Sequence, residues 1–96
     1  MRSSAYKTSD YLKSQADVVA YLNVALEDGE PAVLLEALRN VADAKGGMGA
    51  LAKATGMSRE SLYRTLSRRG NPKIKTVMEL LSALGLKLTI ARQKAA

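Results

Sequence analysis

Apolar residues recur every three or four positions along most of this chain, a spacing that places them on one side of an α-helix. The first stripe begins after Ser14 and stops before Gly29. Its apolar members are Val18, Leu22, Ala25 and Leu26. Ser14 and Asp17 have the spacing of a capping box, in which each side chain accepts a hydrogen bond from the backbone N–H of the other residue. The pattern predicts a helix from about 15 to 28.

Four further helices follow from the same signals, bounded mostly by glycine and proline. Pro31 suits a first helical position, where its missing N–H costs nothing, and Gly56 stops a short third helix. The predicted spans are 31–45, 49–55, 58–67 and 76–84. The chain of 96 residues is therefore expected to be all-α, with length for one compact domain and not two.

The C-terminal end departs from the helical pattern. Leu86, Leu88 and Ile90 alternate with polar or small residues, which is strand periodicity. A lone strand over 86–91 has no partner in an all-helical chain, so it points to pairing with a second copy or another protein. The expected layout of the single domain, 1–96, is a flexible segment over 1–9, N-terminal helices over 10–45, a central unit over 49–67 and a closing helix over 74–85.

The composition excludes several kinds of chemistry. With neither Cys nor His, the chain forms no disulfide, thiolate nucleophile, histidine base or usual zinc site. The N-terminus lacks the apolar core of a signal peptide, and no apolar run approaches the roughly 20 residues of a membrane span. We expect a cytoplasmic protein that is not an enzyme and that uses no cofactor, metal or membrane.

Charge is unevenly distributed between the two halves. Residues 1–45 carry five Lys and Arg against seven Asp and Glu, a net charge of −2, whereas residues 46–96 carry ten against two, a net charge of +8. A basic half favours a polyanionic partner, because its cations neutralise phosphates and release counterions. Nucleic acid is therefore a candidate partner, although a basic helix can also be an ordinary solvated surface.

The stretch LAKATGMSRESLYRTL, residues 51–66, has the layout of a helix-turn-helix. Gly56 can adopt the positive φ that the sharp turn needs, and Met57 can fill the space between the helices. Ser58 can cap the second helix by accepting a hydrogen bond from an N–H near Ser61. These features together favour a helix placed to lie in a DNA groove over a helix that is merely solvated.

The second helix of this unit has two distinct sides when its residues are projected at about 100° each. Leu62 and Leu66 point to one side. The other side and the first turn present the candidate base-reading residues, Arg59, Glu60, Tyr63 and Arg64. Arg59 and Arg64 can each form a bidentate pair with guanine, and Glu60 can accept a hydrogen bond from cytosine.

Other polar groups near this helix suit DNA phosphates, which position a protein without carrying sequence information. The candidates are Gly49, Ser58, Ser61, Ser67, Arg68, Arg69, Lys73 and Lys75. The glycine is included because the N-terminus of the preceding helix, at Gly47 to Gly49, offers backbone N–H groups that can hold a phosphate.

Two other functions fit these residues less well. A nuclease would need paired carboxylates for a metal site, and the basic half contains only Glu60 and Glu79 as acidic residues. An RNA-binding surface usually offers several aromatic stacking side chains, whereas this face has only Tyr63. Double-stranded DNA is therefore the favoured nucleic acid.

Residues 51–88 resemble the helix-turn-helix of the lambda-repressor-like, Cro/CI-type class, which implies a five-helix lambda-repressor-like DNA-binding domain. The marks are Leu51-Ala52, Gly56-Met57-Ser58, Leu62, Asn71-Pro72 and Leu80-x-x-x-Leu84-Gly85-Leu86. The flanking block from Tyr11 to Gly46 looks like the addiction module antidote family, relatives of the HigA antitoxins. Its more specific parts are Tyr11-Leu12 and the run from Ala20 to Gly29.

This resemblance implies an antitoxin of a type II toxin–antitoxin operon. Such a protein neutralises a small RelE/ParE-like (HigB-type) toxin by direct binding and represses its own operon by binding operator DNA as a homodimer. The dimer would form through the C-terminal strand or the closing helix. Many Cro/CI-type domains carry a Gln near the start of the first motif helix, where Met48, Gly49 and Ala50 stand here. The alternative is a Cro/CI-type phage or prophage regulator without a toxin partner.

The resemblance also implies a surface for the toxin. RelE-like toxins are basic because they act on RNA, so an inhibitor should present acidic or apolar groups, as the N-terminal half does. The candidate toxin-binding residues are Tyr11, Asp17, Tyr21, Glu27 and Asp28. The competing interpretation is that Tyr21 and Leu22 belong to the core and that the acidic residues form a solvated face.

Overall fold

The computed structural model describes residues 11–93, and this part of the chain folds into helices joined by turns and extended segments. The five helices are α1 (Gln15–Asp28), α2 (Pro31–Ala44), α3 (Met48–Thr55), α4 (Arg59–Thr65) and α5 (Ile74–Ala83). The prediction of an all-α chain with five helices is confirmed. The segment expected to be flexible, residues 1–9, lies outside the described residues.

The first two helices begin where their capping signals predict. The hydroxyl of Ser14 accepts a hydrogen bond from the N–H of Asp17 at 3.1 Å, and the Asp17 carboxylate accepts one from the N–H of Ser14 at 3.2 Å. Pro31 is the first residue of α2, where proline has no lost hydrogen bond to replace. Local signals of this kind correctly predicted where both helices start.

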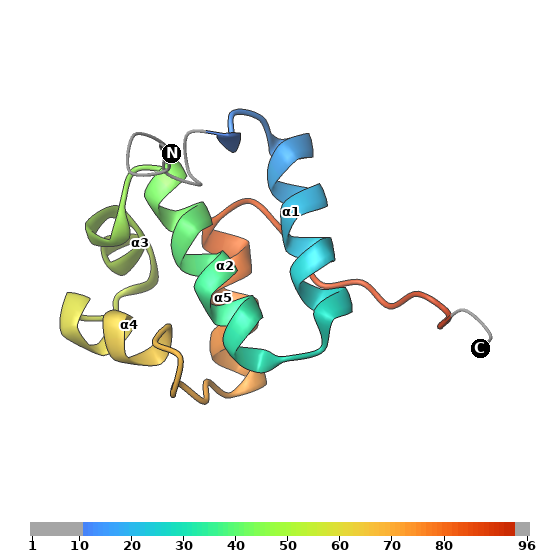
Figure 1. The fold of residues 1–96 in the computed structure, drawn as a ribbon. Helices are drawn as coiled ribbons and strands as arrows, with labels where there is room; N and C mark the ends of the chain where they lie inside the picture. Colours follow the sequence, from blue (N-terminus) through green and yellow to red (C-terminus); the bar gives the residue numbers. More distant parts are fainter. Residues whose placement is uncertain (1–10, 94–96) are drawn as a thin grey trace, which may run out of the picture.

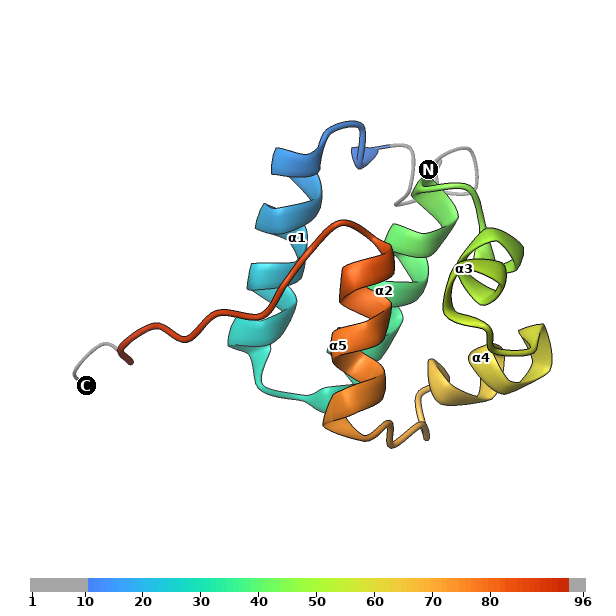
Figure 2. The same cartoon turned by 180° about the vertical axis from the view of Figure 1, so that it is seen from behind.

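The helices are arranged with α2 near the centre. α1 packs against α2, while α3 packs against α2, α4 and α5. Both views place α1 at one edge of the molecule and α3 with α4 at the other (Figures 1 and 2). The buried side chains of largest volume are Val18, Leu38, Val41, Leu62, Leu66 and Leu80. They join all helices except α3 to one core, to which α3 adds Met48, Leu51 and Ala52.

The fourth helix ends at Thr65, two residues before the expected limit of 67. The N–H and the hydroxyl of Ser67 both donate to the carbonyl of Arg64, at 3.3 and 2.8 Å. That carbonyl accepts hydrogen bonds from a residue three positions later, as in a tight turn, and this pattern competes with continuation of the α-helix. The chain then folds back so closely at Gly70 that a β-carbon there would lie 2.0 Å from the Thr65 carbonyl oxygen.

The fifth helix begins at Ile74, two residues before the span that its apolar stripe predicts. Its N-cap residue, Lys73, has extended backbone angles after Pro72, so helical geometry starts at the next residue. At the other end, the side-chain amide of Gln15 donates to the carbonyls of Leu84 and Gly85, both at 3.4 Å. This contact links the start of α1 to the end of α5.

The C-terminal segment is extended but forms no strand within residues 11–93. It leaves α5 and crosses one side of α1 (Figure 2), where residues 86–88 lie beside Val19 and Leu26. Ile90 is fully exposed. The strand periodicity of 86–91 is therefore not realised as a β-strand here, because no other strand among the described residues offers backbone groups for pairing.

Candidate nucleic-acid interface

The turn between α3 and α4 has the geometry that the sequence predicts. Gly56 has φ of 75°, and its N–H donates to the carbonyl of Ala52. The N–H of Met57 also donates to that carbonyl, at 3.1 Å, and its side chain packs against the core. Since a residue with a β-carbon rarely adopts this φ, Gly56 sets the direction in which α4 leaves α3.

The start of α4 is capped as expected. The hydroxyl oxygen of Ser58 accepts a hydrogen bond from the N–H of Ser61 at 3.0 Å. Leu62 is completely buried and Leu66 nearly so, which holds one side of the helix against the core. Ser61 is only half-buried beside the cap. The cap and the two leucines therefore fix both the position and the rotation of α4.

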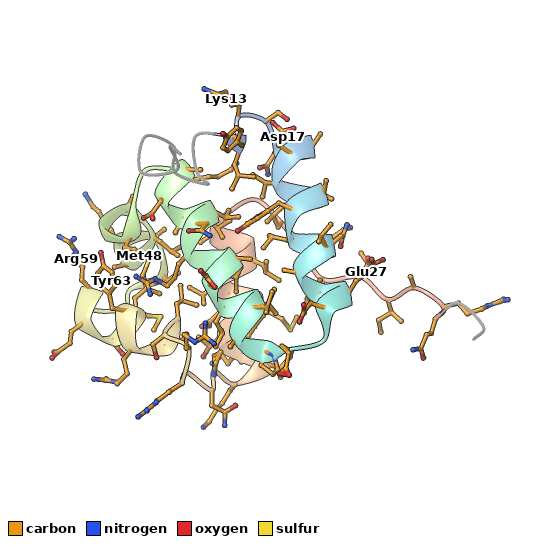
Figure 3. The ribbon with its side chains drawn as sticks, viewed as in Figure 1. Lys13, Asp17, Glu27, Met48, Arg59 and Tyr63 are labelled. Carbon is orange, nitrogen blue, oxygen red and sulfur yellow. The ribbon has the colours of Figure 1, made fainter. Side chains whose placement is uncertain are left out.

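The four candidate base-reading residues lie together on the outer side of α4. All of them are exposed: Arg59, Glu60, Tyr63 and Arg64. Figure 3 shows Arg59 and Tyr63 at the edge of the molecule opposite Glu27 of α1. The structure thus presents two guanidinium groups, one phenol and one carboxylate on a single short helix.

A residue that the sequence did not suggest joins this surface from α2. The guanidinium carbon of Arg39 lies 5.8 Å from the centroid of the Tyr63 ring, within the range of a cation–π contact. Arg39 is exposed. It falls in the acidic half of the sequence, and only the packing of α2 near α4 reveals that it extends the basic surface.

The N-terminus of α3 lies next to Arg59. A β-carbon built on Gly49 would be 3.7 Å from the guanidinium carbon of Arg59, an ordinary contact distance. The N–H of Gly47 donates to the carbonyl of Ala42 at 2.8 Å, so the expectation of an open N–H at that residue is wrong. The amides of the first helical turn, from Met48 to Ala50, have no acceptor within the helix.

The remaining phosphate candidates surround the C-terminal end of α4 and the start of α5. The cationic ones are all exposed: Arg68, Arg69, Lys73 and Lys75. Ser67 is half-buried, and its hydroxyl already donates to the carbonyl of Arg64. The Ser58 hydroxyl oxygen is used as the helix cap, although its O–H can still donate. The cations are therefore better suited to phosphate than the serines are.

Four of the candidate toxin-binding residues lie along α1 and Tyr11 precedes it, and three of the four on α1 have roles within the chain. Asp17 caps α1, and one Asp28 carboxylate oxygen accepts a hydrogen bond from the N–H of Glu30 at 3.2 Å. The half-buried Tyr21 packs against the core, and its hydroxyl accepts a hydrogen bond from the Asn40 side chain at 2.8 Å. Glu27 and Tyr11 are exposed. These local roles account for Asp17, Asp28 and Tyr21 without a partner.

The described part of the chain, residues 11–93, contains no group of three or more acidic side chains placed to hold a metal ion. No helix in this range has the length and apolar character needed to cross a membrane.

The arrangement defines a small helical protein consistent with a helix-turn-helix fold. The model of the family described as "Probable addiction module antidote protein" matches residues 2–92, so the chain belongs to that family. A Haemophilus influenzae protein described as uncharacterized is 34% identical over 89 residues, which cover 93% of this chain and 91% of the relative. No solved structure gives a significant match. Membership in this family indicates an antitoxin role in a toxin–antitoxin system and implies a toxin partner.

Proposed function

We propose that the chain is a DNA-binding antitoxin that neutralises a RelE/ParE-like (HigB-type) toxin by direct binding and represses its own operon. The DNA-binding part of this proposal rests on the outer side of α4. There, Arg59, Glu60, Tyr63 and Arg64 are exposed together on a helix whose rotation is fixed by Leu62. Family membership carries the antitoxin half. Both halves describe binding, so the proposed role involves no catalysis.

In this proposal α4 enters the major groove and its side chains contact base edges. Arg59 is in the first turn, where recognition helices commonly present residues to bases. Arg59 and Arg64 would each pair with guanine, and Glu60 would accept a hydrogen bond from cytosine. Tyr63, beside Arg39, would contact a thymine methyl group or a phosphate.

Phosphate contacts would surround this helix on both sides. Arg68, Arg69, Lys73 and Lys75 are exposed beyond the C-terminal end of α4. On the other side, the first-turn amides of α3 and the guanidinium of Arg59 approach each other at Gly49. A phosphate at that point would receive backbone N–H groups in the position where many relatives of the Cro/CI type use a glutamine side chain.

The protein would bind its operator as a homodimer, since helix-turn-helix proteins commonly pair to read two half-sites. Two exposed apolar surfaces could form the dimer contact. One is the C-terminal segment, with Leu88 and Ile90, and the other is the outer side of α5, with Ile74 and Met78. The strand periodicity of the first surface favours pairing of two C-terminal segments across the dimer axis.

The deciding experiment combines co-expression with footprinting. The protein encoded by the open reading frame that adjoins this gene is co-expressed with the chain and tested for co-purification and for growth arrest when expressed alone. The chain, alone and in complex, is then footprinted on the operon's promoter. A protected site without any bound partner would favour a phage-type regulator, and absence of a protected site would contradict the DNA half.

A further inference from the structure

The side of the α1–α2 pair that faces away from α5 carries an open groove between the two helices. It has a volume of about 290 Å³. Two buried alanines, Ala25 and Ala37, line it, and their small side chains leave the space above them open. Figure 1 shows α1 and α2 side by side on this side, with α5 behind α2.

The groove has apolar walls that the protein leaves in contact with water. Val24 of α1 is 68% exposed and Val33 of α2 is 36% exposed, and both line the groove. At one end, the hydrogen bond from Asn40 to the Tyr21 hydroxyl, 2.8 Å long, joins the two helices. Exposed valines on both walls provide an apolar contact for a side chain of another molecule.

The charged groups that line the groove are all acidic. They are Asp28 of α1 and Glu36 of α2. Arg39, the nearest cation along α2, has its guanidinium beside the Tyr63 ring of α4. The acidic rim is therefore not balanced by a cation of the groove itself, and its charge is opposite to that of the surface around α4.

We propose that this groove is the docking site for the basic toxin, which inserts an apolar side chain between Val24 and Val33 and places Lys or Arg next to Glu36 and Asp28. The choice of occupant follows from the acidic rim, which complements the basic toxin that the resemblance to the antidote family implies, and it rests on the proposed antitoxin function. Oppositely charged surfaces steer two proteins together and fix their orientation. An apolar centre within a charged rim is the usual composition of a protein–protein contact.

The residues that line this groove differ from the toxin-binding residues expected from the sequence. Asp17 lies at the far end of α1 from the groove and serves as a helix cap (Figure 3). Tyr21 and Asp28 border the groove, so they retain a place in the interface. Val24, Val33 and Glu36 are added, because only the pairing of α1 with α2 shows that they share one surface.

Two pairs of matched variants test the inference. Val24→Lys changes the groove and Val19→Lys makes the same change on the side of α1 that faces the C-terminal segment. Glu36→Lys reverses the rim charge and Glu79→Lys makes the same reversal on α5. All four residues are exposed, so the variants should fold, which circular dichroism and thermal melting would verify.

The probe is the purified protein encoded by the adjoining open reading frame, titrated by calorimetry against the full chain. Val24→Lys and Glu36→Lys should each weaken binding by about tenfold or more, as expected for central interface positions. The two controls should change it by less than about twofold. Added NaCl should weaken binding of the wild-type chain by a larger factor than binding of Glu36→Lys.

The other outcomes contradict the inference in distinguishable ways. If the wild-type chain binds the probe and all four variants bind equally well, the groove is not the docking site, but the antitoxin proposal stands. If the wild-type chain does not bind the probe, both proposals fail. If Val24→Lys converts a dimer of the chain alone to monomers in sedimentation, the groove belongs to a second copy of this chain.

Discussion

At the scale of single residues, the proposed DNA surface has two parts, the base-reading candidates on the outer side of α4 and the phosphate candidates beyond its C-terminal end. Arg64 projects from α4 on the side opposite buried Leu62. Lys73 precedes α5 and therefore lies outside α4, the helix proposed to occupy the major groove of DNA. A base contact loses discrimination when it is removed, while a phosphate contact loses affinity for every sequence equally.

Arg64→Ala should weaken binding to the operator by about 1–3 kcal/mol and relax the preference for one base pair. Lys73→Ala should weaken binding to operator and random DNA alike and lower the slope of log affinity against log salt by about one. Fluorescence anisotropy with both DNAs at several salt concentrations measures each effect. Unchanged operator affinity in Arg64→Ala would count strongly against the assignment of α4.

Gly70 is a second residue whose role is visible only in the structure. Gly70→Ala should lower the free energy of unfolding by about 1–3 kcal/mol, because its β-carbon would collide with the carbonyl oxygen of Thr65 and force the backbone apart. Urea denaturation provides the measurement. Gly49→Ala is the control, since its β-carbon would make only ordinary contacts and alanine favours a helix. Equal stability of the two variants would show that the turn after α4 adjusts without cost.

At the scale of elements, the helix starts were predicted well where the capping residues lie within four positions of each other in the sequence. The capping box of Ser14 with Asp17 and the cap of Ser58 on Ser61 are both formed, since these hydrogen bonds depend only on local backbone geometry. The end of α4 was placed two residues too late. A hydroxyl that captures its own helix's carbonyl, as Ser67 does, has no distinct sequence signal.

Ser58→Ala should destabilise the protein by about 1 kcal/mol, because the N–H of Ser61 loses its acceptor at the start of α4. For a protein of this size, such a loss lowers the melting temperature by about 4–8 °C. Calorimetric melting measures it, with Ser82→Ala at an exposed position of α5 as the matched change. A melting temperature as high as that of the Ser82 variant would mean that the cap contributes nothing measurable.

At the scale of the whole molecule, relations between helices could not be predicted from the sequence. Arg39 and Tyr63 belong to different helices, so no periodicity brings them together. The groove between α1 and α2 likewise depends on how Ala25 and Ala37 let two helices approach. The basic side of α4 was predictable because one helix carries it, whereas surfaces shared by two helices require the packing to be known.

The prediction at the scale of the whole molecule concerns which surface joins the two protomers of the proposed dimer. Leu88→Lys should convert a dimer to monomers, because the charge would fall in the apolar row that alternates along the C-terminal segment. Ile74→Lys, at an exposed position of α5, should leave the dimer intact. Sedimentation velocity distinguishes the species. The reverse result would assign the dimer contact to α5.

The placement of α1 and α4 at opposite edges of the molecule has a thermodynamic consequence. If the operator binds at α4 and the toxin in the groove between α1 and α2, as proposed, the two ligands use different surfaces of one protomer, which allows a ternary complex of operator, antitoxin and toxin. Linkage then requires reciprocity: the factor by which toxin changes operator affinity equals the factor by which operator changes toxin affinity. The promoter would therefore change the affinity for the toxin only to the extent, and in the direction, that the toxin changes the affinity for the operator.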